Sequence, residues 1–191
     1  MKGKFIVFEG LDGVGKTTIA KTIGSRKGWV YYRTPPPAFF KECIGLDIRT
    51  QTERRFYKFI ECLVQSSAEI KKIISQGTNV AVDRWIWSTL SYHFAFDQRL
   101  QSRWKHSRPD LSAKVLNPDM SFLVSIADQG EWFHRLDKRE ELTLNDQIVL
   151  GNQKRRGQIL QLFEQLNPEF IKLDNSGSTD QVFNKVNTLL N

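Results

Sequence analysis

Cysteine is scarce in this sequence, and the 191 residues contain only Cys43 and Cys62. The two have no CxxC spacing and no neighbouring His/Cys cluster, which argues against a disulfide framework and a zinc site. Long apolar runs are missing too. The first apolar segment, residues 5–8, is too short for a signal peptide or a membrane span, and a glycine-rich turn follows it. The sequence therefore predicts a cytoplasmic protein that does not associate with membranes.

Repeats and low-complexity stretches are also absent, and the hydrophobic fraction of 40% is typical of a globular chain. A length of 191 residues fits one domain, so we expect residues 1–191 to form a single domain. The net charge of +7 implies an anionic partner. That partner can be nucleic acid or a polyphosphate substrate, and charge alone does not choose between them.

Short β-rich segments alternate with longer segments of helical spacing, which is typical of a parallel sheet with helices on both faces. The strands are expected at residues 4–9, 29–33, 79–83, 120–126 and 169–173. The helices are expected at residues 16–26, 53–76, 85–97, 129–140, 146–166 and 179–190. Two stretches lack either period and are predicted as loops, namely the prolines at 35–37 with their flanks and residues 98–117. The fold class predicted is a three-layer α/β fold with a five-stranded parallel sheet.

Residues 10–17 read GLDGVGKT and fit the phosphate-binding pattern GxxxxGK[ST] in full. The pattern follows a predicted strand and opens a predicted helix, as a P-loop requires. The glycines let backbone N–H groups converge on phosphate oxygens, Lys16 reaches the β and γ oxygens, and the Thr17 hydroxyl binds Mg²⁺. The sequence therefore predicts the P-loop NTPase fold with ATP and Mg²⁺ as cofactors.

Asp12 is an unusual residue inside this loop, because a carboxylate repels phosphate. We expect it to face a sugar hydroxyl or an arginine that holds the second substrate, although an exposed aspartate at the loop tip remains an alternative.

The apolar segment at residues 79–82 ends in Asp83 and Arg84. Asp83 has the position of a carboxylate that holds Mg²⁺, and Arg84 can clamp the phosphate of an acceptor. Ser88 and Tyr92 follow at a spacing that places them on one helix face toward the same cleft. Alternatives are a structural Asp-Arg pair at a helix start and, for Tyr92, an ordinary core aromatic.

Two segments, residues 8–18 and residues 83–92, resemble the thymidylate kinase family in order and spacing. The resemblance extends to residues 33–36 and 118–120 and so covers most of the chain. It implies a nucleoside monophosphate kinase that transfers the γ-phosphoryl group of ATP to a pyrimidine nucleoside monophosphate, with dTMP as the favoured acceptor. By the matching positions, Asp12 and Tyr92 lie near the sugar, and Arg33 and Arg84 hold the acceptor phosphate.

The resemblance also implies which residues hold each substrate. Tyr57 or Phe59 would stack on the base. The residues assigned to ATP are Gly10, Asp12, Gly13, Val14, Gly15, Lys16, Thr17 and Thr18. Those assigned to the acceptor are Asp12, Arg33, Tyr57, Phe59, Arg84, Ser88 and Tyr92. The metal residues are Thr17 and Asp83.

One departure from the family concerns the base. Thymidylate kinases usually keep an arginine four residues after the stacking aromatic, and here Glu61 or Leu63 stands there. Residues 54–70 and the segment after Asp83 look closer to the mitochondrial UMP/CMP kinase branch. A carboxylate at Glu61 suits the amino group of cytosine, which favours CMP or dCMP. The likeness to the UMP/CMP kinase branch keeps UMP and dUMP as alternative acceptors too.

A second departure concerns the lid, which we place around residues 134–150. Family members with a glycine at the position of Gly13 usually supply a transition-state arginine from this region. The candidates here are Arg135 and Arg139, four residues apart on one helix face. A solvated basic turn is the alternative.

Three rival functions remain: a nucleic-acid-binding NTPase, a deoxynucleoside kinase and a degenerate regulatory homologue. The length argues against the first. Two arginines near the acceptor argue against the second, because a neutral hydroxyl would not repay their desolvation. Intact Lys16, Thr17 and Asp83 argue against the third. The partners predicted are thus small nucleotides rather than nucleic acid, and a homodimer is left open.

Overall fold

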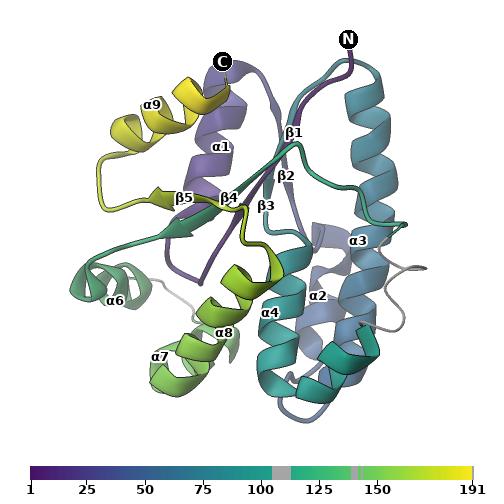
Figure 1. The fold of residues 1–191 in the computed structure, drawn as a ribbon, viewed down its shortest axis with the longest axis vertical. Helices are drawn as coiled ribbons and strands as arrows, with labels where there is room; N and C mark the ends of the chain where they lie inside the picture. The colour runs from purple at the N-terminus through teal and green to yellow at the C-terminus, as the bar shows by residue number, and fades with distance from the viewer. Residues whose placement is uncertain (105–112, 139–141, 143, 191) are drawn as a thin grey trace.

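The computed structural model describes residues 1–104, 113–138, 142 and 144–190. Five parallel strands form one sheet in the order β2-β3-β1-β4-β5 (Figure 1). They are β1 (Phe5–Glu9), β2 (Val30–Arg33), β3 (Val80–Asp83), β4 (Met120–Ser125) and β5 (Ile171–Asp174). Each strand lies within three residues of the position expected from the sequence, and the predicted fold class is confirmed.

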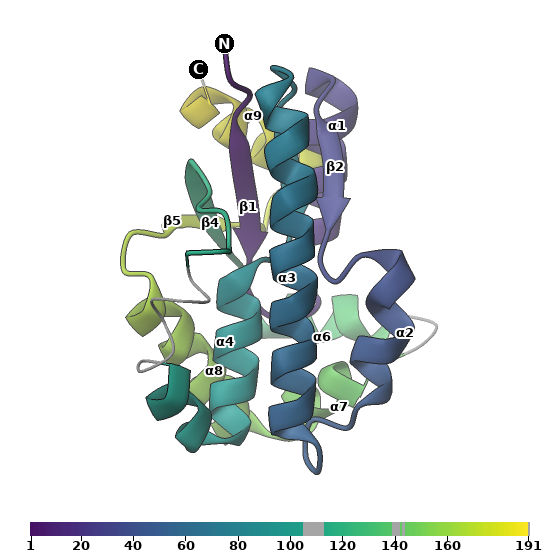
Figure 2. The ribbon, with the colours of Figure 1, turned by 90° about the vertical axis from the view of Figure 1, so that its right-hand side faces the viewer.

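Eight helices have defined bounds within the described residues. They are α1 (Lys16–Lys27), α2 (Pro37–Gly45), α3 (Thr52–Ser75), α4 (Ile86–Phe96), α6 (Gln129–Asp137), α7 (Leu144–Gly151), α8 (Gln153–Leu166) and α9 (Thr179–Leu190). Helix α3 runs along most of the length of the molecule, with β1 beside its second half and α2 beside its first half (Figure 2). None of the helices in these ranges is long and apolar enough to cross a membrane.

The central strand β1 explains the three layers, because its successive side chains point to opposite faces. Ile6 and Phe8 pack with α1 and α9, whereas Phe5 and Val7 pack with α3 and α4. All four side chains are fully buried. In Figure 1, α1 and α9 lie on one side of β1 and α3 lies on the other. A strand buried on both faces is continuously apolar, which is the pattern that residues 5–8 have.

Three expectations from the sequence are wrong. The stretch after the prolines is not a loop, because Pro37 is the first residue of α2, where its fixed φ and missing N–H are tolerated. Residues 98–104, also expected in a loop, are helical and bury Leu100 and Trp104. The single helix expected over 146–166 is divided at Asn152, whose side chain accepts from Arg155 N at 2.9 Å and caps α8.

The strand register brings the polar residues after the strands to one edge of the sheet. Arg33 pairs with Asp83, and Asp83 pairs with Phe8. At the other side of β1, Ser125 pairs with Asp174. The residues that follow these strands therefore meet at the carboxyl edge, which is where ligands bind in sheets of this kind.

Candidate active site

The loop after β1, residues 10–15, leads directly into α1. Its glycines are required by conformation and by space. Gly13 and Gly15 have φ values of 85° and 90°. A Cβ on Gly13 would lie 2.5 Å from Leu136 Cγ, and one on Gly15 would overlap the amide nitrogen of Asn175. The loop is thus held in a left-handed backbone that other residues rarely adopt.

Lys16 is buried at the first position of α1, with 5% of its surface exposed. Its Nζ donates to Leu11 O at 2.5 Å, across the loop. Burial, and after it the positive charge of Arg84, lower the pKa of Lys16 to about 8, against the opposing effect of Asp12 and Asp83. Within the described residues this buried ammonium donates to one carbonyl, which leaves N–H groups that suit an incoming phosphate.

Asp83 ends β3 opposite the start of α1. Its Oδ2 accepts a hydrogen bond from the Thr17 hydroxyl. Its Oδ1 is buried and has no hydrogen-bond partner within the described residues. A carboxylate oxygen without a partner, next to a hydroxyl with unused lone pairs, is a donor set that suits Mg²⁺. The two predicted metal residues are therefore adjacent and fit the ion.

Arg84 links the P-loop to α4. Its backbone has φ 70°, and its guanidinium forms an ion pair with Asp12 and donates to Ser88 Oγ at 3.0 Å. Burial lowers the pKa of Arg84, but Asp12 and the other acidic groups around it together more than offset this effect, so the net pKa is raised and the guanidinium stays charged. Tyr92 completes the cluster by donating to Asp12 Oδ2 at 2.7 Å. Asp12 therefore faces an arginine, one of the two partners expected for it.

Glu9 is a buried carboxylate that the sequence analysis did not assign to the site. Its Oε1 accepts from the backbone N–H groups of Trp85 and Ser88 at 3.0 and 3.1 Å, and its Oε2 accepts from the Ser88 hydroxyl. Burial raises its pKa, and these hydrogen bonds oppose the shift. Glu9 fixes the N-terminus of α4 and so orients Ser88 toward Arg84.

A pocket of about 290 Å³ opens beside Arg84. The residues that line it come from the P-loop, the segment after β2, and helices α2, α3 and α4. They include Asp12, Arg33, Thr34, Phe40, Arg55, Phe59, Arg84, Ser88, Tyr92 and His93. The structure thus gathers six of the seven residues predicted for the acceptor.

Helix α3 separates the two aromatics predicted to stack on the base. Phe59 lines the pocket, whereas Tyr57 is 38% exposed and does not. The expectation for Glu61 is wrong, because its side chain is 70% exposed and pairs with Lys58 Nζ at 3.4 Å outside the pocket. Residues two apart on a helix point in different directions, so Glu61 cannot share the pocket with Phe59.

Helix α6 lies against the P-loop and carries one of the two predicted lid arginines. Trp132 Nε1 donates to Asp12 O at 2.7 Å. Arg135 Nη2 contacts Glu131 Oε1 at 2.5 Å and Asn175 O at 3.0 Å, and Arg135 lies near Gly15. Arg139 lies outside the described residues, as do residues 140, 141 and 143 of the segment predicted as a lid.

Comparison with known proteins identifies the family. The family model "Thymidylate kinase" matches residues 8–186. The chain belongs to the thymidylate kinase family. It is 26% identical over 193 residues to a probable thymidylate kinase of Thermoplasma volcanium, covering 95% of this chain and 94% of the relative. It is 25% identical over 205 residues to a thymidylate kinase of Lactobacillus acidophilus, covering 100% and 94%.

The fold agrees with that of a thymidylate kinase from Candida albicans, with a TM-score of 0.74 over 99% of this chain and 91% of that chain at 18% identity. These matches confirm the resemblance, the fold class and the enzyme class predicted from the sequence, an ATP-dependent nucleoside monophosphate kinase.

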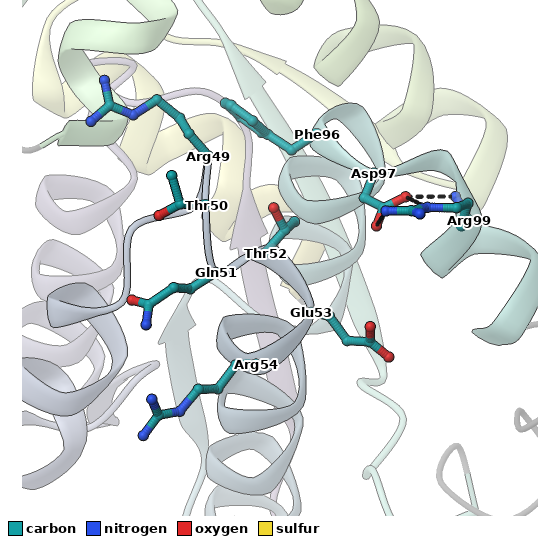
Figure 3. Close-up of a pocket in the computed structure, with 9 residues that line it drawn as sticks. All are labelled: Arg49, Thr50, Gln51, Thr52, Glu53, Arg54, Phe96, Asp97 and Arg99. Carbon is teal, nitrogen blue, oxygen red and sulfur yellow. Dashed lines mark hydrogen bonds and ion pairs between the residues drawn. The ribbon is translucent and has the colours of Figure 1, made fainter.

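A larger hollow of about 670 Å³ lies away from the family's phosphate loop, at the N-terminal end of α3 (Figure 3). Two of its arginines already pair with aspartates, Arg49 with Asp47 and Arg99 with Asp97. The hollow contains no residue of the P-loop or of the segment after β3. Its size alone therefore does not make it the active site.

The sequence analysis missed several residues of the thymidylate kinase site besides Glu9. Asn175 follows β5, and its side chain donates to Val14 O at 2.7 Å, which supports the P-loop. Its place directly after a strand was a usable signal. Arg55 and His93 line the pocket from helix interiors, and no motif marks them.

Proposed function

We propose that this chain transfers the γ-phosphoryl group of ATP to dTMP, using Mg²⁺. The observation that carries the proposal is the Arg84, Asp12 and Tyr92 cluster. It lies where the P-loop meets the 290 Å³ pocket, since all three residues line that pocket. A donor and an acceptor nucleotide bound on the two sides of this cluster would bring their phosphates together, which is the main requirement of phosphoryl transfer.

On the donor side, the backbone of residues 10–17, Val14 included, would hold the β and γ phosphates, and Thr18 follows this segment on α1. Lys16 would exchange its bond to Leu11 O for phosphate oxygens. Asp83 and Thr17 would hold Mg²⁺, which supplies charge neutralisation between the phosphates when bound. The unpartnered Asp83 Oδ1 supports this assignment.

On the acceptor side, Arg84 would bind the phosphate of dTMP while Asp12 and Ser88 hold its guanidinium in place. Arg33 lines the same pocket and would supply the second positive charge. Its guanidinium lies 5.2 Å from the ring centroid of Phe40 on α2. Two cations around one phosphate dianion reduce its repulsion from the γ-phosphate of ATP.

Arg135 lies beside Gly15 and would stabilise charge on the transferred group after leaving Glu131. The single domain, the lid, the role of Arg139, the cytoplasmic location and the homodimer stay predictions.

The test is a panel assay. Purified protein is incubated with Mg-ATP and each nucleoside monophosphate, with thymidine and deoxycytidine added as unphosphorylated acceptors. ADP release should be fastest with dTMP and absent with the two nucleosides. Faster turnover of thymidine than of dTMP would make the chain a nucleoside kinase, and ADP release that needs single-stranded DNA would make it a nucleic-acid-dependent NTPase.

A further inference from the structure

Cys43 and Cys62, the two cysteines of the chain, meet where α2 packs on α3. Their Sγ atoms lie 3.4 Å apart, although the residues are 19 positions apart in the sequence. Both are free thiols, and both side chains are buried. The sulfurs of a disulfide are about 2.05 Å apart, so these two would have to approach by roughly 1.3 Å. A small shift of one helix is therefore enough to join them.

Helix α2 buries little of its surface against the rest of the chain. Among its residues, Pro37–Gly45, Cys43 is the one that is buried. Near it, Lys58 of α3 pairs with Glu42 at 2.9 Å, an ion pair open to solvent. A short helix with one buried side chain opens locally at a low free-energy cost. In Figure 2, α2 lies at the edge of the view, so a small molecule can reach the sulfurs when α2 shifts outward.

The surroundings make Cys62 the more reactive of the two thiols. A hydrogen bond from Cys43 and the positive charge of Lys58 lower the pKa of the Cys62 thiol, although burial opposes the shift. The pKa of Cys43 is raised, because Cys43 donates this hydrogen bond and is buried. The thiolate is the form that attacks an oxidant. Cys62 is therefore expected to react first, with Cys43 beside it to react second.

We propose that Cys43 and Cys62 are a modification site, at which hydrogen peroxide forms a reversible disulfide that weakens acceptor binding. The Cys62 thiolate attacks one peroxide oxygen, the O–O bond breaks, and Cys62 becomes a sulfenic acid while the other oxygen leaves as water with a proton from solvent. Cys43 then attacks the Cys62 sulfur, an S–S bond forms, and the sulfenic oxygen leaves as water. The two thiols are oxidised by two electrons in total, and the peroxide is reduced to two molecules of water.

The disulfide would act on the acceptor pocket through α2. Phe40 and Ile44 line the pocket from α2, one on each side of Cys43 in the sequence. The Arg33 guanidinium lies 5.2 Å from the ring centroid of Phe40. Drawing Cys43 toward α3 would shift this wall of the pocket and fix α2 in place. The disulfide itself does not depend on the proposed function, whereas its effect on acceptor binding rests on it.

Counting free thiols tests the disulfide without any assay of activity. The reduced protein is treated with hydrogen peroxide, unfolded in the presence of N-ethylmaleimide and weighed by mass spectrometry. Because the chain has only two cysteines, the untreated protein should take up two maleimides. The oxidised chain should take up none, without added oxygen, and dithiothreitol should restore both thiols. Uptake of two maleimides after oxidation, or a loss of thiols that dithiothreitol does not reverse, would overturn the proposal.

Single variants test the order in which the thiols react. Alanine suits both positions, because a buried free cysteine behaves as a small apolar residue. Cys43→Ala retains the thiol that should react first, so dimedone, which traps sulfenic acids, should label it about fivefold faster than it labels Cys62→Ala. Equal labelling of the two variants, or faster labelling of Cys62→Ala, would disprove the assignment of Cys62.

Kinetics test the effect on the acceptor. The oxidised wild type should have a KM for dTMP about tenfold higher than the reduced protein, because a shift of about 1 Å in groups that position a substrate is costly. The Kd for ATP should not change, and dithiothreitol should restore the KM. The double variant Cys43→Ala/Cys62→Ala, treated in the same way, is the matched control and should keep its KM.

The outcomes separate this inference from the proposed function. A disulfide that leaves the KM for dTMP unchanged would disprove the effect on the acceptor. An equal rise in KM in the double variant would assign the effect to oxidation elsewhere and would disprove it too. A chain that phosphorylates no nucleotide in either state would disprove the proposed function, and the thiol count would still decide whether the disulfide forms.

Discussion

The phosphate side and the base side of the site differ in how their polar groups are satisfied. On the phosphate side the cations already have partners in the protein, since Lys16 bonds to Leu11 O and Arg84 pairs with Asp12. On the base side Arg55 Nε and His93 Nε2 have no partner within the described residues. The first side is organised before any ligand binds, whereas the second carries groups that a ligand can satisfy.

Removing the main phosphate-side cation should have the largest effect. Lys16→Ala should lower kcat on the order of a thousandfold, because its charge acts on the transferred group. Steady-state kinetics with dTMP measures the loss, and circular dichroism checks the fold. Lys21→Ala, on the exposed face of α1, is the control and should keep wild-type activity. A folded Lys16→Ala variant with more than about a tenth of the wild-type kcat would contradict this role.

The boundary between the two sides can be probed at Arg84. Arg84→Ala should lower kcat/KM for dTMP about a hundredfold, with a higher KM, because the acceptor phosphate loses its clamp. Titration calorimetry should find the Kd for ATP within about threefold of the wild type. If ATP affinity collapsed while dTMP affinity held, Arg84 would belong to the donor side, and its assignment to the acceptor phosphate would be wrong.

The lowered pKa of Lys16 predicts that ATP binding, on the phosphate side, depends on pH. With a pKa of about 8, Lys16 is mostly charged at pH 7 and mostly neutral at pH 9. The affinity for ATP should therefore fall about tenfold between these pH values, because only the charged form attracts phosphate. Equilibrium titrations across this range measure it. In the Lys16→Met variant, the affinity for ATP should not fall in this way between pH 7 and pH 9. If it falls as much as in the wild type, the pH dependence comes from another group.

The smallest effect concerns stability and the base side. The pKa of His93 is about 3 in the folded chain, against an ordinary value of 6.5. Between pH 7 and 5.5 the unfolded chain gains a proton at His93 and the folded chain does not, so stability falls. The loss is about 1 kcal/mol. Urea unfolding at both pH values should give a smaller loss for His93→Asn than for the wild type. Equal losses would mean that His93 is solvated in the folded chain.

The sequence predicted the phosphate side far better than the base side. Residues 10–17 are contiguous, and their glycines dictate a backbone that binds phosphate whatever surrounds it. The strands were predictable because a strand that is buried on both faces, such as β1, has a continuously apolar sequence. Helix α2 was missed because a run of prolines was interpreted as a loop, although the last of them can begin a helix.

The residues of the base side could not be predicted from a contiguous motif. These residues come from three helices, α2, α3 and α4, and the exposure of Glu61 depends on how α3 is rotated against the rest of the chain. His93 meets Phe59 only after α3 and α4 pack together, whereas Arg55 lies one turn before Phe59 on α3 itself. A motif search has no signal for contacts of this kind.

The strand register has a consequence for how such an enzyme can change over evolutionary time. Phe8, Asp83 and Arg33 stand level in three adjacent strands, so an insertion of one residue in any of them would turn the following side chains to the wrong face. The side chains that would surround the base in the proposed function, in contrast, are carried by α2, α3 and α4. Substitutions there leave the strand ends in place. New acceptor preferences can therefore arise by single mutations in these helices, while the residues that position the two phosphates are inherited unchanged.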